Sequence, residues 1–334
     1  MFPLLATIIL QDKMKKIAIS IVGILIIFLV VFMAHRCSIN ESRNRVSKQD
    51  IFVPGRTRIS SRNNNDGKTN TLQKQESNAI EMANVISNIP NQILSKLGYT
   101  VSYNHYTKCA NWVAWHLTRA HAEDTTFPRS GVPYFDENGY ACGIGRVTLE
   151  TQRGDYFLDL QAEEPRQQLM DWPNNEYGME HGHLCPAADN RWSMAAMNQS
   201  FLLTNMCPQT HKLNSGVWQS LEDDCRNWAI RYGEIFIATG PIFYNGISRT
   251  IGKGKVGVPD AFYKVIFRMY PTKETIGFIY PNEGSYGERV EYVKTVDEIE
   301  SITGIDFFYN LPDEIENEIE AKASLSKWQE NTHI

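Results

Sequence analysis

The sequence lacks any pattern that would assign its six cysteines a role. None of them forms a Cys-x-x-Cys pair in the 334 residues, which excludes a structural zinc site or a dithiol redox motif of that spacing. Their number permits disulfides without requiring them, and buried thiols are an equally good interpretation. No internal repeat is present. The cysteines are Cys37, Cys109, Cys142, Cys185, Cys207 and Cys225.

Most of the chain also lacks the positive charge that nucleic-acid-binding proteins usually carry. The formal net charge is −5; residues 1–37 carry +3 and residues 38–78 carry +4, which leaves −12 for residues 79–334. Affinity for nucleic acid comes largely from basic side chains that displace counterions. If this protein acts on nucleic acid, the attraction must therefore be local to its site.

One long hydrophobic run is present, close to the N-terminus. Residues 17–34 read IAISIVGILIIFLVVFMA, carry no charge and are long enough to span a bilayer as a helix. A cleavable signal peptide is the alternative, but the run exceeds the usual apolar core of one, and Ala34-His35-Arg36 is a poor cleavage site. The sequence therefore predicts an N-terminal segment at 1–16 and a transmembrane anchor (or signal segment) at 17–34.

A polar linker and one folded domain are expected after this run. Residues 35–78 are rich in Ser, Asn, Arg and Gln and cannot bury enough surface to offset chain entropy, so they predict a flexible linker. Hydrophobic residues make up 42% of the chain and charged residues 21%, which is enough apolar material for a domain over residues 79–334.

Apolar patterns within this domain predict both strands and helices. A helical period runs through residues 79–97 and is broken by Pro90. Residues 214–232 read as an amphipathic helix, and residues 312–329 as an acidic helix with a solvated face. Stretches rich in β-branched and aromatic residues predict strands at 99–104, 111–118, 233–243, 261–270 and 275–281.

The residues with the most chemical information lie between Gly178 and Glu222. Phosphodiester hydrolysis needs a base to activate water and a cation to neutralise charge in the transition state. His183 could be the base, and the amide oxygen of Asn214 is a reasonable Mg²⁺ ligand. Glu222 follows Asn214 by eight residues and shares its helical stripe, so it could orient the water shell of a metal held there.

These residues also stand in the pattern of a known family. Alone, a histidine is more often structural, and an asparagine at a helix start is usually an N-cap. Residues 180–189, EHGHLCPAAD, however, resemble the Asp-Arg-Gly-His motif and Pro-Ala-rich stretch of the DNA/RNA non-specific endonuclease family. Residues 205–209 match its Asn-x-x-Pro-Gln element, and residues 214–222 match Asn-x-Gly-x-Trp-x-x-x-Glu. The likeness extends over about residues 95–312.

The resemblance implies an α+β fold of the ββα-metal (His-Me finger) type, with a six-stranded antiparallel central sheet flanked by helices. It implies an endonuclease that depends on Mg²⁺, with Mn²⁺ as a substitute, and that cleaves DNA and RNA. Within the site it implies His183 as the base, Asn214 as the direct metal ligand, Glu222 as the residue that orients the metal's water, and Asn205 as a site-shaping hydrogen-bonding residue.

Substrate contacts follow less directly from the motif. The family's upstream phosphate-binding arginine best matches Arg129, with Arg119 as its competitor. Where the family has Asp-Arg, this chain has Glu180 and His181, and a histidine near its ordinary pKa is largely neutral at pH 7. If His181 binds phosphate, activity should rise as the pH falls until the base is protonated. Residues 137–170 look longer than the usual spacer and predict a lid or an interface.

Localisation and partners follow from the anchor and the activity together. A nuclease free in the cytoplasm would attack the host's own nucleic acid, so the domain is expected outside the cytoplasm, in a bacterial cell envelope, or secreted if the segment is cleaved. The expected partners are DNA, RNA and a membrane bound through residues 17–34; a homodimer and an inhibitor protein are left open.

Three other interpretations compete with an active nuclease. One is a catalytically impaired family member that binds nucleic acid or a protein partner. Another is a zinc protein that uses His181, His183 and Cys185, whose alternation on a strand would place them on one face. The third is an envelope scaffold on a tether, which explains the N-terminus but not the motif.

Overall fold

The computed structural model describes residues 79–129, 131, 135, 144–145, 147–148, 150–172 and 178–329. The predictions for residues 1–16, 17–34 and 35–78 lie outside this part of the chain. Within it, no helix combines the length and the apolar character that crossing a bilayer requires. The prediction of a membrane-anchored protein is corrected accordingly, since the expected transmembrane helix is not supported.

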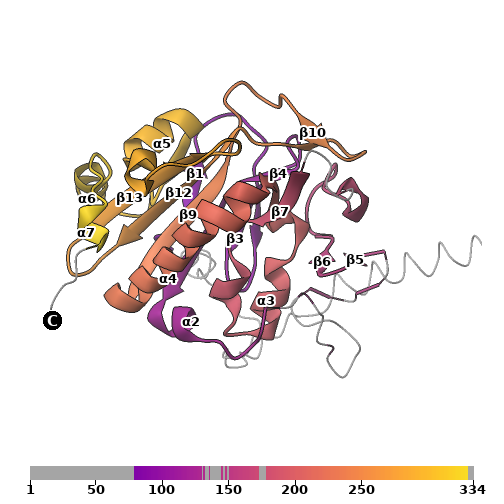
Figure 1. Cartoon of the computed structure of the whole chain (residues 1–334), viewed down its shortest axis with the longest axis horizontal. Coiled ribbons are helices and arrows are strands. Elements are labelled where there is room, and N and C mark those ends of the chain that lie inside the picture. The colour runs from indigo at the N-terminus through magenta and orange to yellow at the C-terminus, as the bar shows by residue number, and fades with distance from the viewer. Residues whose placement is uncertain are drawn as a thin grey trace, which may run out of the picture. The chain divides into compact units, whose positions relative to one another are not determined.

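An antiparallel sheet of seven strands organises the described residues (Figure 1). Its order is β14-β13-β12-β9-β4-β3-β2, and all neighbours run antiparallel. The five predicted strands are confirmed, and the sheet has one strand more than the resemblance implied. The strands are β2 (Gln92–Ser95), β3 (Thr100–Asn104), β4 (Cys109–Thr118), β9 (Glu234–Ile242), β12 (Ala261–Arg268), β13 (Glu274–Pro281) and the two-residue β14 (Val293–Lys294).

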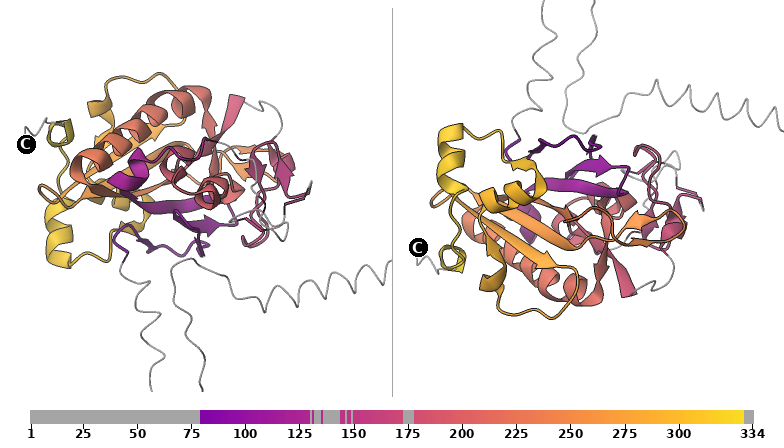
Figure 2. Two further views of the ribbon diagram at one scale, coloured as in Figure 1. Left: turned by 90° about the horizontal axis from the view of Figure 1, so that it is seen from below. Right: turned by 90° about the horizontal axis from the view of Figure 1, so that it is seen from above.

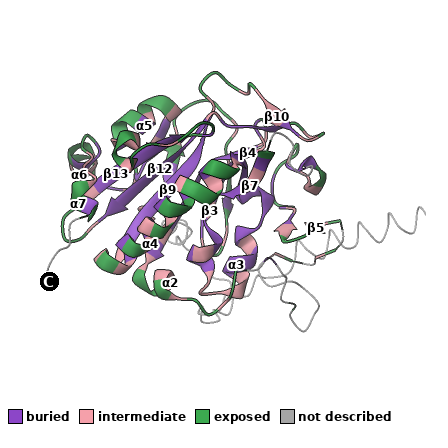
Figure 3. Ribbon diagram, in the orientation of Figure 1, coloured by how far each residue is buried: buried purple, intermediate pink, exposed green. Residues whose placement is uncertain are grey.

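Helices cover the sheet on both faces, which explains why its central strands read as nearly continuous apolar runs. All eight residues of β12 are buried. Phe262 and Ile266 pack in the core that contains residues of α4, whereas Tyr263 and Val265 point into the core on the opposite face. Figures 2 and 3 show this arrangement, with buried strands at the centre and exposed helix surfaces outside. The helices are α2 (Arg119–Glu123), α3 (Met194–Ser200), α4 (Gln219–Tyr232), α5 (Val296–Thr303), α6 (Asp313–Ile319) and α7 (Ser326–Gln329).

Short two-stranded pairings and single helical turns complete the described fold. The paired strands are β1 (Ala83–Val85) with β15 (Ile305–Phe307), β5 (Gln152–Arg153) with β6 (Tyr156–Phe157), β7 (Met179–His183) with β8 (Met206–Thr210), and β10 (Thr250–Ile251) with β11 (Val256–Gly257). The 3₁₀ turns are η1 (Leu169–Asp171), η3 (Ala187–Asn190), η4 (Leu203–Asn205) and η6 (Arg289–Tyr292); η5 (Leu213–Trp218) is a π-type turn.

The helix predicted over residues 79–97 is wrong. This stretch contains β1, which pairs antiparallel with β15, and β2, which forms one edge of the main sheet. Two apolar residues of the supposed helical stripe, Ile86 and Ile89, are exposed. Backbone pairing with a strand more than 200 residues away therefore overrode a short helical period.

The predicted helix at 214–232 is present as two consecutive elements, η5 and α4. Gly216 lies inside η5 with φ −118° and ψ −111°, which interrupts regular helical geometry at that point. α4 then runs without interruption and ends at Gly233, whose φ of +92° favours glycine.

The described cysteines are buried thiols. Cys109, Cys185, Cys207 and Cys225 have almost no exposed surface, and none of these four forms a disulfide. Burial raises the pKa of the Cys225 thiol to about 12, so it stays protonated and unreactive near neutral pH. For these four residues the interpretation as buried thiols is confirmed.

The C-terminal segment differs from the single solvated helix that its acidic sequence predicts. Two short helices replace it, and the α7 residue Trp328 has no exposed surface. Its ring centroid lies 4.9 Å from that of Trp228 on α4, and its carbonyl accepts a hydrogen bond from Arg231 Nη1 at 3.2 Å. Acidic residues do face solvent on α6, but the segment is anchored by one buried aromatic side chain.

Replacing Trp328 with alanine should therefore lower the free energy of unfolding by about 3–5 kcal/mol, because it leaves a large cavity against α4. Urea unfolding of the Trp328→Ala protein measures this loss. The neighbouring exposed residue provides the control, since Gln329→Ala removes no buried surface. Equal stability of the two variants would show that α7 does not dock on the core.

Candidate active site

A two-stranded hairpin followed by a helix carries the candidate catalytic residues. β7 pairs antiparallel with β8, with His183 opposite Met206, and the chain then enters η5 and α4. This places His183 on a strand, Asn214 in the first helical turn and Glu222 on α4. Gly182 is required by close packing, since a Cβ there would lie 2.2 Å from Oε1 of Gln209.

A pocket of about 230 Å³ opens where the hairpin meets the helix. It brings together four residues that the motif singled out, His183, Asn214, Glu222 and Arg129. The remaining lining residues are Pro186, Ala187, Ala188, Ser215, Gln219 and Arg226. Residues 85 positions apart in the sequence, Arg129 and Asn214, therefore face one space.

His183 is held as a neutral imidazole in this pocket. It is 7% exposed, and its ring meets the ring of Phe201 edge-on, with 5.0 Å between the centroids. Burial first, and then the positive charge of Arg129, lowers the pKa of His183 to about 3. Its Nε2 has no hydrogen-bond partner in the described part of the chain. A neutral ring with a free nitrogen at a pocket is suited to exchange a proton with a bound molecule.

Glu180 fixes the orientation of Asn214. Asn214 Nδ2 donates to Glu180 Oε2 at 2.8 Å, and His211 Nδ1 lies 2.7 Å from Glu180 Oε1. Burial opposes the charge of Glu180, but these two hydrogen bonds hold the pKa of its carboxyl below the ordinary value. Because Nδ2 is engaged, Oδ1 is the atom of Asn214 that remains to bind a cation.

Glu222 lies beside a buried cation. Burial raises the pKa of Glu222 to about 8, and the charge of Lys264 opposes this rise. Lys264 is fully buried; its Nζ lies 4.6 Å from the ring centroid of Trp218 and donates no hydrogen bond to any described residue. An amide oxygen and a partly buried carboxylate at one pocket form the kind of oxygen donor set that a hard divalent cation prefers. The residues present therefore fit such a cation.

Two arginines line the pocket, but only Arg129 lies there without a described ion pair, since Arg226 is paired with Asp189 and Asp223. Arg129 is exposed, with its Cζ 5.8 Å from the ring centroid of Phe201. Arg226 lies one helical turn after Glu222 and donates to Asp189 Oδ1 at 2.8 Å. Arg226 was not among the residues predicted from the sequence, although its spacing of four from Glu222 was a usable signal. Arg119, the competitor of Arg129, instead donates to the Ile230 carbonyl at 2.7 Å and does not line the pocket.

Asn205 is buried behind the pocket and does not line it. Its Oδ1 accepts from the Cys185 backbone N–H at 2.9 Å, and its Nδ2 donates to the carbonyls of Cys185 and Ser200 at 2.9 and 2.8 Å. All of its side-chain bonds thus go to backbone. It ties the segment after His183 to the end of α3.

His181 points into a second pocket, of about 340 Å³. Its ring is stacked between Tyr156 and Trp172, with centroid distances of 3.8 and 3.9 Å. Burial first, and then the charge of Arg153, lowers the pKa of His181 to about 4. The ring is therefore neutral near pH 7, and the protonated state that phosphate binding would need is disfavoured.

The zinc hypothesis finds no site here. His181 and His183 line different pockets, and the buried Cys185 Sγ accepts a hydrogen bond from Asn190 Nδ2 at 3.3 Å. In the described ranges, the one group of three or more His, Cys, Asp or Glu side chains that could hold a metal lies elsewhere, at Asp297, Glu300 and Glu320.

Comparisons with known proteins agree with the motif. The family model for DNA/RNA non-specific endonuclease matches residues 76–314. A nuclease of Nostoc sp. is 30% identical over 248 residues, covering 70% of this chain and 78% of its own. Mitochondrial endonuclease G of Bos taurus is 32% identical over 184 residues, covering 52% of this chain and 54% of its own.

A solved structure shares the fold. A chain in the crystal structure of the EndoG/EndoGI complex superimposes with a TM-score of 0.52 at 22% identity, covering 67% of this chain and 89% of that chain. At this identity the likeness speaks for the mixed α/β fold with its large antiparallel sheet. Since the family model matches well over half of the residues, the chain belongs to the DNA/RNA non-specific endonuclease family and is a phosphodiesterase.

Proposed function

We propose that this protein is an endonuclease that hydrolyses the phosphodiester bonds of both DNA and RNA, with His183 as general base and Mg²⁺ or Mn²⁺ as cofactor. The observation that carries the proposal is the shared pocket of His183, Asn214, Glu222 and Arg129. The β7-β8-α4 unit that builds this pocket corresponds to the ββα-metal arrangement that the motif implied.

His183 would accept the proton of the attacking water. Its lowered pKa keeps the ring neutral, and the edge contact with Phe201 holds its orientation. Arg129 would place its permanent charge beside the phosphate oxygens. Asn214 Oδ1 would bind the divalent cation, which neutralises charge on the phosphate when bound. Glu222 would orient the water around it, and Glu180 would keep the Asn214 amide turned the right way.

The cleavage assay separates an active nuclease from an impaired family member. Supercoiled plasmid and RNA are incubated with the purified protein in Mg²⁺, in Mn²⁺ and in EDTA. The proposal expects both substrates to be degraded with either metal and to survive in EDTA. Binding of nucleic acid without cleavage under every metal condition would instead support the impaired, nucleic-acid-binding interpretation.

Outside the catalytic pocket, we infer that Arg153, and not His181, provides the positively charged side chain that contacts the substrate's phosphates. It lies exposed at the rim of the second pocket, where its Nη1 donates to the Leu169 carbonyl at 3.2 Å. The two pockets adjoin, because the Tyr156 ring that covers His181 lies 6.5 Å from the ring of His183. A strand whose scissile phosphate faces His183 can therefore extend past the stacked rings to this guanidinium.

Replacing Arg153 with alanine should raise KM for a DNA duplex several-fold with little change in kcat, and should reduce the slope of log affinity against log salt by about one. The effect should be the same at pH 6 and at pH 9, because arginine keeps its charge. Arg119→Ala is the control, since that side chain lies outside both pockets. An unchanged KM and an unchanged salt slope in Arg153→Ala would show that this guanidinium makes no phosphate contact.

A further inference from the structure

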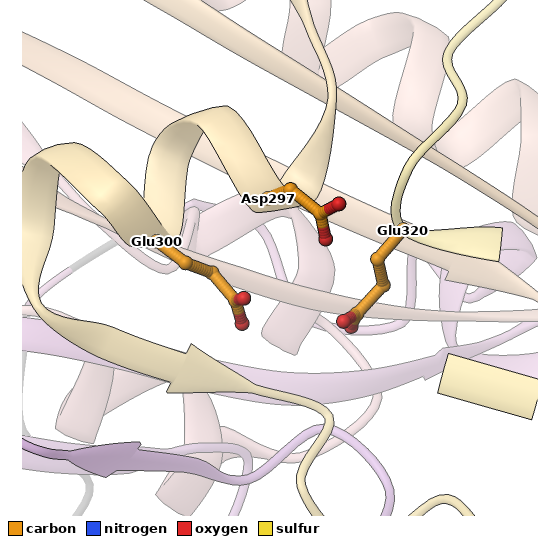
Figure 4. Close-up of side chains that lie close together, drawn as sticks. All are labelled: Asp297, Glu300 and Glu320. Carbon is orange, nitrogen blue, oxygen red and sulfur yellow. The ribbon is translucent and has the colours of Figure 1, made fainter. Parts of the chain in front are cut away.

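Three carboxylates meet on the face of the sheet opposite the candidate active site. Asp297 and Glu300 lie on α5, and Glu320 follows the last residue of α6 (Figure 4). One oxygen of each lies within 4.8 Å of an oxygen of both others. The apolar neighbours Val296 and Ile299 on α5 pack in the core on that face, whereas the residues of α4 pack in the other core.

The negative charge of this cluster has no described counterion. Glu320 is 3% exposed, and its Oε1 has no hydrogen-bond partner within the described ranges. The lysines on the adjoining segments are paired elsewhere, Lys294 with Glu298 at 3.8 Å and Lys322 with Glu318 at 4.0 Å. Burial of a carboxylate is unfavourable unless it is paired, hydrogen-bonded or bound to a metal.

Neighbouring carboxylates make the electrostatic potential at this cluster more negative. Burial first, and then the charges of Glu300 and Glu316, raise the pKa of Glu320 to about 9. Burial likewise raises the pKa of Glu300 to about 7, although the Phe307 N–H donates to its Oε1 at 2.7 Å. No described positive charge therefore offsets the carboxylates near Glu320, the most buried residue of the three.

We propose that Asp297, Glu300 and Glu320 form a second divalent-cation site, suited to Ca²⁺ and separate from the nuclease centre. Ca²⁺ binds oxygen at roughly 2.3–2.6 Å, so ligands on its opposite sides are about 4.6–5.2 Å apart. Oxygens that all lie within 4.8 Å of one another are close enough to contact one such ion. A set of protein carboxylates favours Ca²⁺, because Mg²⁺ usually keeps several of its waters and is held by only one or two carboxylates.

The position of Glu320 gives the site a structural role. The Glu320 carbonyl accepts from the backbone N–H groups of Val296 and Asp297 at 3.1 and 3.4 Å, which joins the end of α6 to the start of α5. From here the chain passes from one face of the sheet, where Ile319 packs, to the other, where Trp328 packs. A bound ion ties α5 to the point at which the C-terminal segment crosses between the two cores.

Thermal unfolding of the full chain tests the proposal, after removal of metals with EDTA and titration with CaCl₂. The Tm should rise on the order of 5–10 °C at a Ca²⁺ concentration about 100 times Kd. Glu320→Gln keeps the side-chain shape but removes the charge, so it should fold, cleave DNA at the wild-type rate and lose the Ca²⁺ shift. Glu318→Gln, on the exposed face of the same helix, should keep the full shift.

Asn214→Ala separates this site from the catalytic pocket. The Ca²⁺ shift should persist in that variant, because the acidic cluster does not include Asn214. A shift that disappears in Asn214→Ala and persists in Glu320→Gln would place the ion in the catalytic pocket and overturn the proposal. A wild-type Tm that ignores Ca²⁺ and rises only with acidification would show that the cluster binds protons and no cation.

Discussion

Cleavage of both DNA and RNA should fall by about 100- to 10,000-fold when His183 is replaced with alanine, because a positioned general base typically contributes that much to the rate. Among the described residues, His183 is the one histidine that lines the candidate catalytic pocket, and its Nε2 has no hydrogen-bond partner there. Initial rates on plasmid and on RNA at saturating metal measure the loss. Circular dichroism and urea unfolding then show whether the variant keeps its fold.

His116→Ala is the matched control for this experiment. His116 also lies on a central strand, but it stacks on Phe236 with 4.4 Å between ring centroids and its Nε2 lies 2.8 Å from Glu234. Its removal should leave the rate within a factor of a few of wild type. If the folded His183→Ala protein retains more than about a tenth of the wild-type rate, His183 is not the base.

Replacing Asn214 with alanine should have the second largest effect, a loss of at least about 10- to 100-fold in rate or metal affinity. The change removes the Oδ1 ligand and leaves Glu180 Oε2 without its 2.8 Å partner. The rate is measured as a function of Mg²⁺ concentration, and the half-saturating concentration should rise. Asn214→Asp retains an oxygen and should recover part of the metal affinity.

Glu180→Gln tests whether Glu180 acts by orienting the Asn214 side chain. It keeps the size of the side chain but weakens its hold on Asn214, so its effect should have the same direction and be smaller. The double variant should lose less than the two single losses combined, because both changes disturb one contact. A fall in rate without any change in metal dependence would show that Asn214 acts as a helix cap and not as a ligand.

The grouping of three candidate catalytic residues in one pocket could be predicted because all three belong to one short stretch of the chain. His183, Asn214 and Glu222 come from a single strand-strand-helix unit, so their spacing in the sequence nearly dictates their spacing in space. The central strands were equally visible, since burial on both faces requires long runs of β-branched and aromatic residues. These features depend on neighbours along the chain, which a sequence displays directly.

The environment of each residue depended on segments that are distant in the chain. His181 occupies a position where the family motif has an arginine, yet Tyr156 and Trp172 enclose it and keep its ring neutral. Nothing near Lys264 in the sequence showed that Trp115 and Trp218 would bury its charge near Glu222. Desolvation depends on what packs around a group, and packing is a property of the whole fold.

At both ends of the domain, contacts with distant segments overrode the structure that the local sequence pattern predicts. An apolar period of helical type at residues 79–97 became two strands, because the pairing partners β15 and β3 offered backbone hydrogen bonds that a short helix could not match. The acidic residues 312–329 were read from composition as a solvated helix, but the chain crosses the sheet edge and buries Trp328 against α4. By itself, the sequence determined the family, the candidate catalytic motif and the main strands, since these are encoded in local spacing and periodicity. Tertiary structure alone decided which charges are buried, which arginines reach the substrate pockets and where the chain ends dock, because each of these depends on contacts between residues far apart in the chain.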